Sequence, residues 1–149
     1  DDLDRRIIAT LQIDGTTTNI AIARDTGVSE ETVRRRTKRL IGDGIIKIAG
    51  VPNSAKLGVD SQALIGLQVD ADKLDAVAET LAEMNEITWV AITTGSIDVM
   101  AWVELRSSDE LRELLSSYVS GIDGVRRTET FVCMENLKQQ YGMTVTLEA

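Results

Sequence analysis

The amino-acid sequence predicts an α+β protein: a small N-terminal part made of helices, followed by a larger part with the element order βαββαβ. Two observations predict this fold class. In the first 46 residues, apolar side chains recur at helical spacing in three short segments that turn residues separate. From residue 62 onwards, four runs rich in β-branched residues enclose two amphipathic segments. This is the order of a ferredoxin-like split unit with an antiparallel sheet.

Three helices are predicted before residue 46. The apolar stripe of the first helix stops at Asp14 and Gly15, and Gly27 ends a short second helix at about residues 19–26. Ser29 is a good N-cap for the third helix, because its hydroxyl can accept a hydrogen bond from a free backbone amide. Three short helices with a tight glycine turn before the third are typical of a helix-turn-helix.

The third helix carries five basic side chains in a chain whose net charge is −8. Because phosphate backbones attract cations and the major groove of DNA admits a single helix, this helix is predicted to bind DNA. The predicted contacts with base edges are Ser29, Glu31, Thr32 and Arg35, those with phosphates are Arg36, Lys38 and Arg39, and Arg34 completes the predicted DNA-binding set. The alternatives are a solvated charged face and a simple ion pair between Glu31 and Arg35.

Charge divides the chain at the same place as the helix and strand patterns. Residues 1–50 carry a net charge of +1, whereas residues 51–149 carry −9. Asymmetry of this kind indicates two roles, with the DNA-facing role near the N-terminus. The acidic part is expected to repel DNA, which argues against a protein that wraps DNA around its outside.

The second part of the chain is predicted to form four strands and two helices. The strands are expected at residues 63–69, 87–94, 99–105 and 125–134, the helices at residues 74–81 and 111–119, and one more strand at residues 45–51. The predicted domains are a helix-turn-helix DNA-binding domain at residues 1–46, a strand linker at residues 47–61 and a ferredoxin-like domain at residues 62–149. With both helices on one face, the sheet has a bare second face, and pairing with a second copy is the simplest cover.

Composition argues against several classes of protein. The hydrophobic content of 43% indicates a globular chain, no apolar run reaches the roughly 18 residues that span a bilayer, and Cys133 is the single cysteine. A reducing, cytoplasmic location is therefore expected. The sequence has no histidine, which removes the commonest general base and metal ligand. Neither catalysis nor a metal or cofactor is expected.

The order of these parts resembles the Lrp/AsnC family of bacterial and archaeal transcriptional regulators. The resemblance rests on the opening Leu3-Asp4-Arg5-Arg6-Ile7-Ile8, the segment from Val28-Ser29 to Ile46, the turn Gly95-Ser96-Ile97-Asp98 and the segment from Arg127 to Glu135. It implies a DNA-binding head, a strand linker and an effector-sensing domain. It further implies homodimers that assemble into higher oligomers, up to an octamer, with small effectors, commonly amino acids, bound between dimers.

An effector site is predicted around the turn at residues 95–98. Gly95 permits close approach of a ligand to the backbone, free amides there suit a carboxylate, and Asp98 suits an α-ammonium group. The predicted effector-binding residues are Thr93, Thr94, Gly95, Ser96, Asp98, Thr128 and Thr130. The alternative is an ordinary hairpin turn with threonines on an exposed strand face. Ser96 and Ile97 stand where members of the family often carry Asp and an aromatic residue, which leaves the identity of the effector open.

The predicted function is that of a sequence-specific DNA-binding transcriptional regulator modulated by a small effector such as an amino acid. One alternative is an architectural DNA-binding protein with little sequence selectivity. The other is an enzyme, because sirohaem decarboxylases resemble paired chains of this family. Those enzymes look to use a histidine near the tetrapyrrole, and this sequence contains none, so the enzyme is the weaker alternative.

Overall fold

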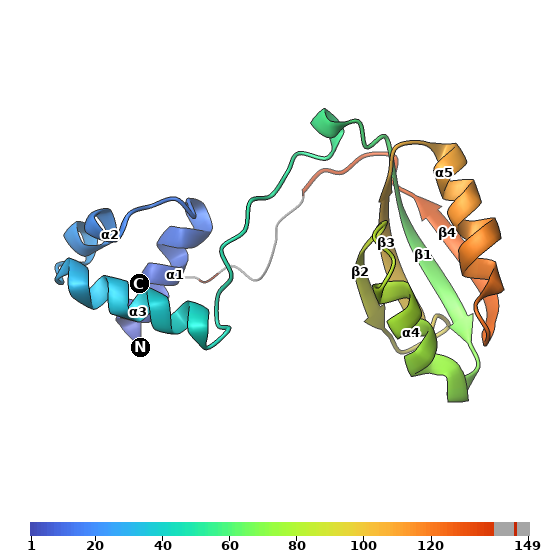
Figure 1. The fold of residues 1–149 in the computed structure, drawn as a ribbon, viewed down its shortest axis with the longest axis horizontal. Helices are drawn as coiled ribbons and strands as arrows, with labels where there is room; N and C mark the ends of the chain where they lie inside the picture. Colours follow the sequence, from blue (N-terminus) through green and yellow to red (C-terminus); the bar gives the residue numbers. More distant parts are fainter. Residues whose placement is uncertain (139–144, 146–149) are drawn as a thin grey trace. The chain divides into compact units, whose positions relative to one another are not determined.

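The structure, a computed structural model, describes residues 1–138 and residue 145 of the chain (Figure 1). The chain divides into two compact units, each with its own hydrophobic core. The first unit, named the head, comprises Asp1–Val51 and also includes the described residues Lys138 and Val145. The second unit, named the sheet unit, comprises Pro52–Leu137. The α+β fold class predicted from the sequence is confirmed.

The head consists of three helices, α1 (Asp2–Ile13), α2 (Asn19–Thr26) and α3 (Glu30–Gly42). Each helix contributes to one core, with Ile7 from α1, Ile22 and Ala23 from α2, and Val33 and Leu40 from α3. Gly27, between α2 and α3, has a φ of 72°, a left-handed conformation that glycine adopts without a steric penalty. The three predicted helices and the glycine turn before the third are confirmed.

Residues 45–51 do not form the strand expected from their apolar pattern. The backbone amides of Ile45 and Ile46 instead donate to the carbonyl oxygen of Leu40 at 2.9 and 3.2 Å, which satisfies a free carbonyl at the C-terminal end of α3. A strand also needs a neighbour for its hydrogen bonds, and this segment pairs with no strand in the described part of the chain. The strand expected in the linker is therefore corrected, for the single chain, to an irregular segment with a 3₁₀ turn at Ala55–Leu57.

The sheet unit has the predicted order βαββαβ. Its strands are β1 (Ser61–Val69), β2 (Ile87–Ile92), β3 (Val99–Leu105) and β4 (Val125–Val132), and its helices are α4 (Leu74–Ala82) and α5 (Ser108–Glu113). The strands pair in the order β2-β3-β1-β4, and every pairing is antiparallel. β2 and β4 each end two residues before the predicted limit. The predicted helix at residues 111–119 begins earlier, and α5 continues as a π-helical turn at Leu114–Tyr118.

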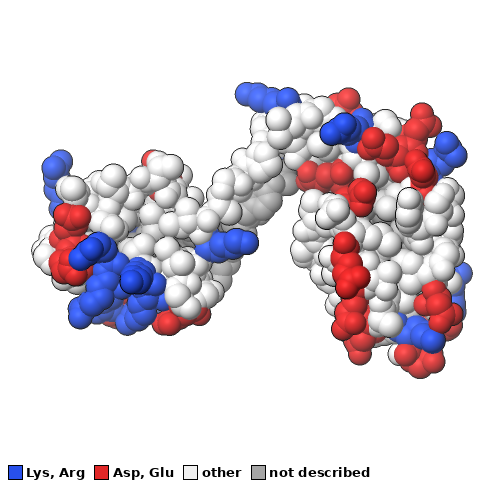
Figure 2. All heavy atoms as spheres, viewed as in Figure 1, with Lys and Arg blue, Asp and Glu red and all other residues white. Residues whose placement is uncertain are grey.

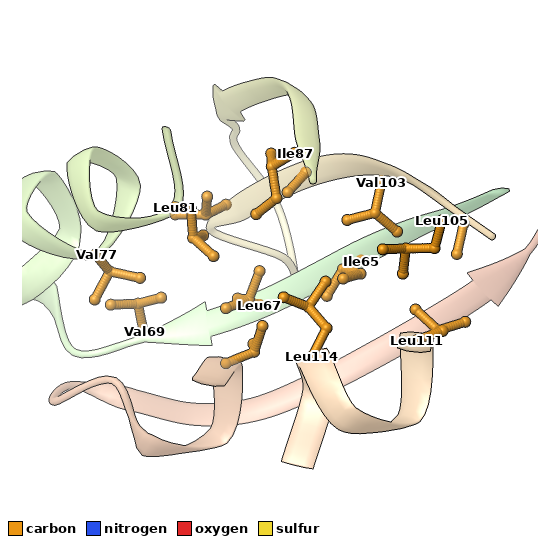
Figure 3. Packing of buried hydrophobic residues seen from close by; sticks show 14 residues of the cluster. Ile65, Leu67, Val69, Val77, Leu81, Ile87, Val103, Leu105, Leu111 and Leu114 are labelled. Atoms are coloured by element: carbon orange, nitrogen blue, oxygen red, sulfur yellow. The ribbon is translucent and has the colours of Figure 1, made fainter. Parts of the chain in front are cut away.

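One face of the sheet packs against the helices (Figure 3). Ile65 and Leu67 of β1 are fully buried in this core, together with Val77 and Leu81 of α4. Leu114, directly after α5, closes the core on the other side. Because successive strand residues point to opposite faces, the residues of β1 between these core positions lie on the second face of the sheet.

The second face of the sheet, named the open face, has no helix over it in the described chain. A row of side chains crosses it: Trp89 of β2 lies opposite Trp102 of β3, Trp102 opposite Leu64 of β1, and Leu64 opposite Phe131 of β4. Trp89 is 48% exposed and Phe131 is 55% exposed. Leu64 and Trp102 are half-buried. The face that the topology predicts to be bare is therefore apolar and exposed in a single copy.

Candidate nucleic-acid interface and effector loop

α3 is held in the head by its N-terminal end and by its buried side. The Ser29 hydroxyl accepts a hydrogen bond from the Thr32 amide at 3.2 Å, as an N-cap does. Val33 and Leu40, on one side of the helix, are at most 1% exposed. Helical spacing places Arg35 and Lys38 on the other side, away from this core. The side of α3 that carries them, together with Glu31 and Arg34, is named the outward face.

The outward face carries two cations that no described residue of the head pairs with. Arg35 and Lys38 are exposed, and within the described residues neither side chain makes a hydrogen bond or an ion pair. Arg34 is also exposed, and its Nε donates to a carboxylate oxygen of Glu31 at 3.1 Å. The sequence alternative of a Glu31–Arg35 pair is thus corrected to Glu31–Arg34, one position closer on the helix. Figure 2 shows several basic side chains of the head gathered in one patch, with others set apart from it.

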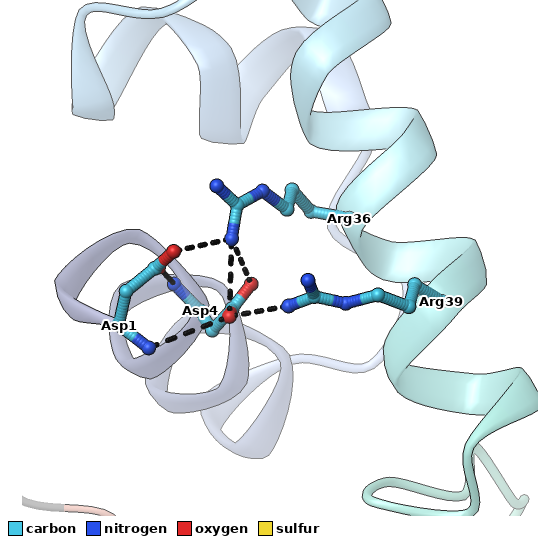
Figure 4. Close-up of polar contacts among 4 residues, drawn as sticks. All are labelled: Asp1, Asp4, Arg36 and Arg39. Atoms are coloured by element: carbon cyan, nitrogen blue, oxygen red, sulfur yellow. Dashed lines mark hydrogen bonds and ion pairs between the residues drawn. The ribbon is translucent and has the colours of Figure 1, made fainter.

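The two remaining arginines of α3 turn towards α1 (Figure 4). Arg39 donates from Nη2 to Oδ2 of Asp4 at 2.6 Å, and Arg36 donates from Nη1 to the same oxygen at 3.2 Å. Arg36 also contacts the carboxylate of Asp1. These four residues are named the Asp4 cluster. Its ion pairs join α1 to α3, in addition to the apolar core.

Asp4 is buried within this cluster, with 8% of its surface exposed. Burial alone raises the pKa of the Asp4 carboxyl group, but the guanidinium groups of Arg39 and Arg36 outweigh burial. The pKa of Asp4 therefore lies below its ordinary value of 3.8. At neutral pH Asp4 is a buried anion that two arginines neutralise.

The predicted DNA-binding residues thus occupy three places. Glu31, Arg34, Arg35 and Lys38 lie on the outward face, Arg36 and Arg39 lie in the Asp4 cluster, and the hydroxyls of Ser29 and Thr32 hydrogen-bond each other at 2.8 Å at the start of α3. The contact between Asp4 and α3 is not among the sequence predictions. The available signal was its position three residues before Ile7, on the apolar stripe of α1, where a carboxylate needs a cationic partner.

The predicted effector turn belongs to the loop at residues 93–98, named the β2–β3 loop. The Thr93 amide donates to the carbonyl oxygen of Asp98 at 2.8 Å, and the Thr93 hydroxyl donates to the carbonyl oxygen of Ile97 at 2.7 Å. Gly95 has a φ of 113°, a conformation that favours glycine. Thr94, Gly95 and Ser96 are exposed. Internal hydrogen bonds therefore fix the shape of the loop and leave its tip accessible.

Asp98 ties the β2–β3 loop to the end of β1. Its Oδ2 accepts a hydrogen bond from the Val69 amide at 2.8 Å. Arg126, which is not among the predicted site residues, lies with Nη2 at 3.9 Å from the same oxygen and donates to the Val69 carbonyl oxygen at 3.0 Å. No sequence pattern predicts this contact, because Arg126 is simply a basic residue at the start of β4. Asp98 therefore holds the β2–β3 loop against the end of β1 whether or not a ligand binds.

Thr128 and Thr130 lie apart from the β2–β3 loop. They pair with Leu67 and Ile65 of β1, which are buried under the helices, so both threonines face the helix layer. The glycine between these two β1 residues faces the opposite side, where Ile97 of the loop packs over it. Thr130 instead lines an open groove of about 480 Å³ beside α5. The structure therefore does not bring the seven predicted effector residues into one cluster.

Comparison with known families assigns the chain. Residues 1–41 match the AsnC-type helix-turn-helix domain, and residues 62–143 match the Lrp/AsnC ligand binding domain. The chain belongs to the Lrp/AsnC family. The family predicted from the sequence motifs is thereby confirmed, and this Lrp/AsnC protein is an AsnC-type helix-turn-helix transcriptional regulator with a ligand-binding domain.

Relatives of this Lrp/AsnC protein match it over nearly the whole length. A helix-turn-helix-type transcriptional regulator of Pyrococcus furiosus is 40% identical over 143 residues, which are 95% of this chain and 97% of the relative. The regulator FL11 of the same organism is 36% identical over 146 residues, 97% of this chain and 96% of the relative. The structure of E. coli AsnC is 29% identical and has a TM-score of 0.88, with 95% of this chain and 96% of that chain covered.

A fourth similar protein supports the fold alone. The transcriptional regulator of Neisseria meningitidis that was solved as a complex with L-Met has a TM-score of 0.89 at 19% identity, with 96% of this chain and 95% of that chain covered. Within the described residues of the present protein, no helix is long and apolar enough to cross a membrane. The same residues contain no group of three or more His, Cys, Asp or Glu side chains placed to hold a metal ion.

Proposed function

We propose that this regulator recognises specific DNA sequences with the outward face of α3, and that an amino acid modulates it through the sheet unit. The observation that carries the first part is the exposure of Arg35 and Lys38 on a helix whose opposite side is buried. A helix with this distribution can enter the major groove with its cations directed at DNA and its apolar side against the head.

The roles on the outward face follow from side-chain chemistry. The planar guanidinium of Arg35 suits a bidentate contact with a guanine edge, whereas Lys38 and Arg34 suit phosphate oxygens. Recognition helices contact bases mainly through their N-terminal residues. Ser29, Glu31 and Thr32 lie at the start of α3, and we assign base contacts to these three residues.

Selection of binding sequences from a random pool of DNA duplexes tests this assignment. Enrichment of a defined sequence by the wild-type protein, with weaker enrichment after Arg35→Ala, would support specific recognition. Equal retention of all duplexes would favour the architectural alternative. The net charge of −9 on residues 51–149 opposes that alternative, because DNA wrapping needs cations over the outside of the protein.

A homodimer is proposed on the basis of the open face. Its row of apolar side chains, with Trp89 and Phe131 about half exposed, is the kind of surface that a second sheet covers in an isologous pair. A dimer would also supply two copies of α3, which a helix-turn-helix protein needs to read two half-sites. Assembly of dimers into larger oligomers, up to an octamer, belongs to the same proposal. Sedimentation equilibrium of the full chain measures the state directly.

An amino-acid effector is proposed from three supporting observations. Residues 62–143 match a ligand-binding domain, and a protein of the same fold was solved with L-Met. The β2–β3 loop also presents an exposed tip made of Thr94, Gly95 and Ser96. The backbone and hydroxyl groups of such a tip suit the carboxylate and ammonium groups of an amino acid.

Thermal denaturation with each of the twenty amino acids tests the effector proposal. A ligand present at about 100 times its Kd stabilises the folded state by about 2.7 kcal/mol, which raises the melting temperature by several degrees. A rise with one or a few amino acids would support the proposal. Failure of all twenty to raise the melting temperature would contradict an amino-acid effector.

A further inference from the structure

Asp4 lies on the buried side of α1, facing α3 (Figure 4). It occurs three residues before Ile7, which is fully buried, so the two residues share one side of the helix. Its carboxylate binds Arg39 at 2.6 Å and Arg36 at 3.2 Å. Two of the five cations of α3 therefore make their charge-assisted hydrogen bonds to a carboxylate of the head itself, although the Arg36 side chain is 25% exposed and the Arg39 side chain 49% exposed.

A DNA phosphate would have to compete with Asp4 for these arginines. Guanidinium bonds to a carboxylate and to a phosphate are alike in geometry and in strength. Taking both arginines from Asp4 would leave a buried carboxylate without a cationic partner, which is strongly unfavourable. The arginines themselves lower the pKa of Asp4, so the carboxylate stays ionised and remains a competitor at neutral pH.

We infer that Asp4 is a positioning residue that withholds Arg36 and Arg39 from the DNA backbone, so that α3 meets DNA with the cations of its outward face. This inference rests on the proposed DNA-binding role of α3. Phosphate contacts attract DNA of any sequence. Withholding two arginines therefore reduces sequence-independent binding and leaves the base-reading contact of Arg35 with a larger share of the total affinity.

The number of phosphate contacts is measurable from the salt dependence of DNA binding. The logarithm of the binding constant falls linearly with the logarithm of salt concentration, with a slope of about −0.9 for each phosphate neutralised. Arginines withheld by Asp4 contribute nothing to this slope. A residue that only stabilised the head would not change the slope of the folded protein, so the slope separates positioning from stability.

Asp4→Asn and Asp25→Asn form a matched pair of variants for this measurement. Both remove one negative charge from the head, but Asp25 is exposed on α2 and, within the described residues, makes no hydrogen bond or ion pair. The full chain is titrated with a random-sequence duplex by fluorescence anisotropy between about 50 and 200 mM salt. Circular dichroism establishes that each variant is folded under these conditions.

Asp4→Asn is expected to steepen the slope by about 0.9, because Arg39 is freed while Arg36 keeps its contact with Asp1. The affinity for random-sequence DNA is expected to rise several-fold at the lower salt concentration. Asp25→Asn is expected to leave the slope at the wild-type value. An unchanged or shallower slope in folded Asp4→Asn protein would overturn the inference.

Arg39→Gln and Lys38→Gln keep the test decisive if Asp4→Asn does not fold. Each removes one cation from adjacent positions of α3, but Lys38 lies on the outward face and Arg39 in the Asp4 cluster. Lys38→Gln is expected to make the slope shallower by about 0.9, and Arg39→Gln to leave it unchanged. Equal changes in both variants would overturn the withholding role and leave DNA binding by α3 intact. A slope that neither Lys38→Gln nor Arg35→Gln changes would overturn the proposed DNA-binding face itself.

Discussion

The Val69 amide donates a hydrogen bond to Oδ2 of Asp98 at 2.8 Å, which joins the end of β1 to the β2–β3 loop. The Asp98 amide donates in turn to the carbonyl oxygen of Leu67 at 2.9 Å. Asp98 is therefore fixed from both its side chain and its backbone. The sequence predicts the Asp98 carboxylate as a ligand for an ammonium group, but in the structure this carboxylate links the β2–β3 loop to β1.

Asp98→Ala is expected to lower the free energy of unfolding by about 1–3 kcal/mol, because the Val69 amide loses its acceptor. Urea denaturation followed by tryptophan fluorescence reports this change, since Trp89 and Trp102 both lie in the sheet unit. Ser96→Ala, at an exposed position of the same loop, is expected to stay within about 0.5 kcal/mol of wild type. Equal stability of Asp98→Ala and wild type would contradict the anchoring role.

Ser96→Ala is expected to reduce the thermal shift caused by the effector, because it removes an exposed hydroxyl from the proposed site. Thr128→Ala removes a hydroxyl from the other side of the sheet and serves as the matched control. Loss of one hydrogen bond to a ligand corresponds to about 1 kcal/mol, or roughly a five-fold higher Kd. If Thr128→Ala reduces the shift and Ser96→Ala does not, the effector binds on the helix side of the sheet instead.

Arg35→Ala is expected to lower the affinity for the selected DNA sequence by about 1–3 kcal/mol and to relax the preference at one base position. Lys38→Ala is expected to weaken binding to all sequences alike, since a phosphate contact carries no sequence information. Binding curves on the selected duplex and on single-base variants of it separate the two effects. Uniform weakening by Arg35→Ala would move Arg35 to the phosphate contacts.

Local signals in the sequence were sufficient to predict most of the architecture. Apolar spacing located all three helices of the head, and Gly27 and Ser29 marked the turn and the N-cap before α3. The same patterns gave the order of the sheet unit, because each strand or helix buries one side of itself. The bare face of the sheet followed from the topology alone.

Contacts between residues distant in sequence were beyond these signals. Arg36 and Arg39 reach Asp4 across more than thirty residues, and only the packing of α3 on α1 decides which arginines turn inward. The sequence prediction puts Thr130 beside the β2–β3 loop, which the structure does not confirm. The register of β4 on β1 decides which face of the sheet Thr130 occupies, and local sequence patterns do not encode this register. Residues 45–51 have a strand-like pattern, but a strand also requires a partner.

The ion pairs of Asp4 are expected to make the stability of the head depend on pH. Its pKa is lowered in the folded state, so its contribution to stability is complete above the ordinary pKa of 3.8 and is lost as pH falls through the lower folded pKa. The stability advantage of wild type over Asp4→Asn is therefore expected to shrink as the pH is lowered from 6 to about 2. Urea denaturation followed by far-UV circular dichroism measures this stability advantage. Tryptophan fluorescence reports the unfolding of the sheet unit, which contains both tryptophans, and serves as the control. An advantage that stays constant over this range would contradict the ion pairing of Asp4.

Trp89→Lys is expected to weaken self-association of the sheet unit. Trp89 begins the apolar row that crosses the open face, and it is 48% exposed in a single copy. A tryptophan anchor in an interface commonly contributes about 2 kcal/mol or more, so the dimer dissociation constant should rise at least about thirty-fold. An unpaired lysine ammonium buried between two sheets adds a desolvation penalty.

Sedimentation equilibrium over a range of protein concentrations measures this change, with the 16.3 kDa chain as the mass unit. Thr80→Lys introduces the same charge on the exposed surface of α4, in the helix layer that covers the other face of the sheet, and is the matched control. Thr80→Lys is expected to keep the wild-type mass, whereas Trp89→Lys shifts towards the monomer. An equal mass above that of the monomer for wild type and Trp89→Lys at every concentration would mean that the chain associates through another surface, and a monomeric mass for wild type would contradict the proposed homodimer.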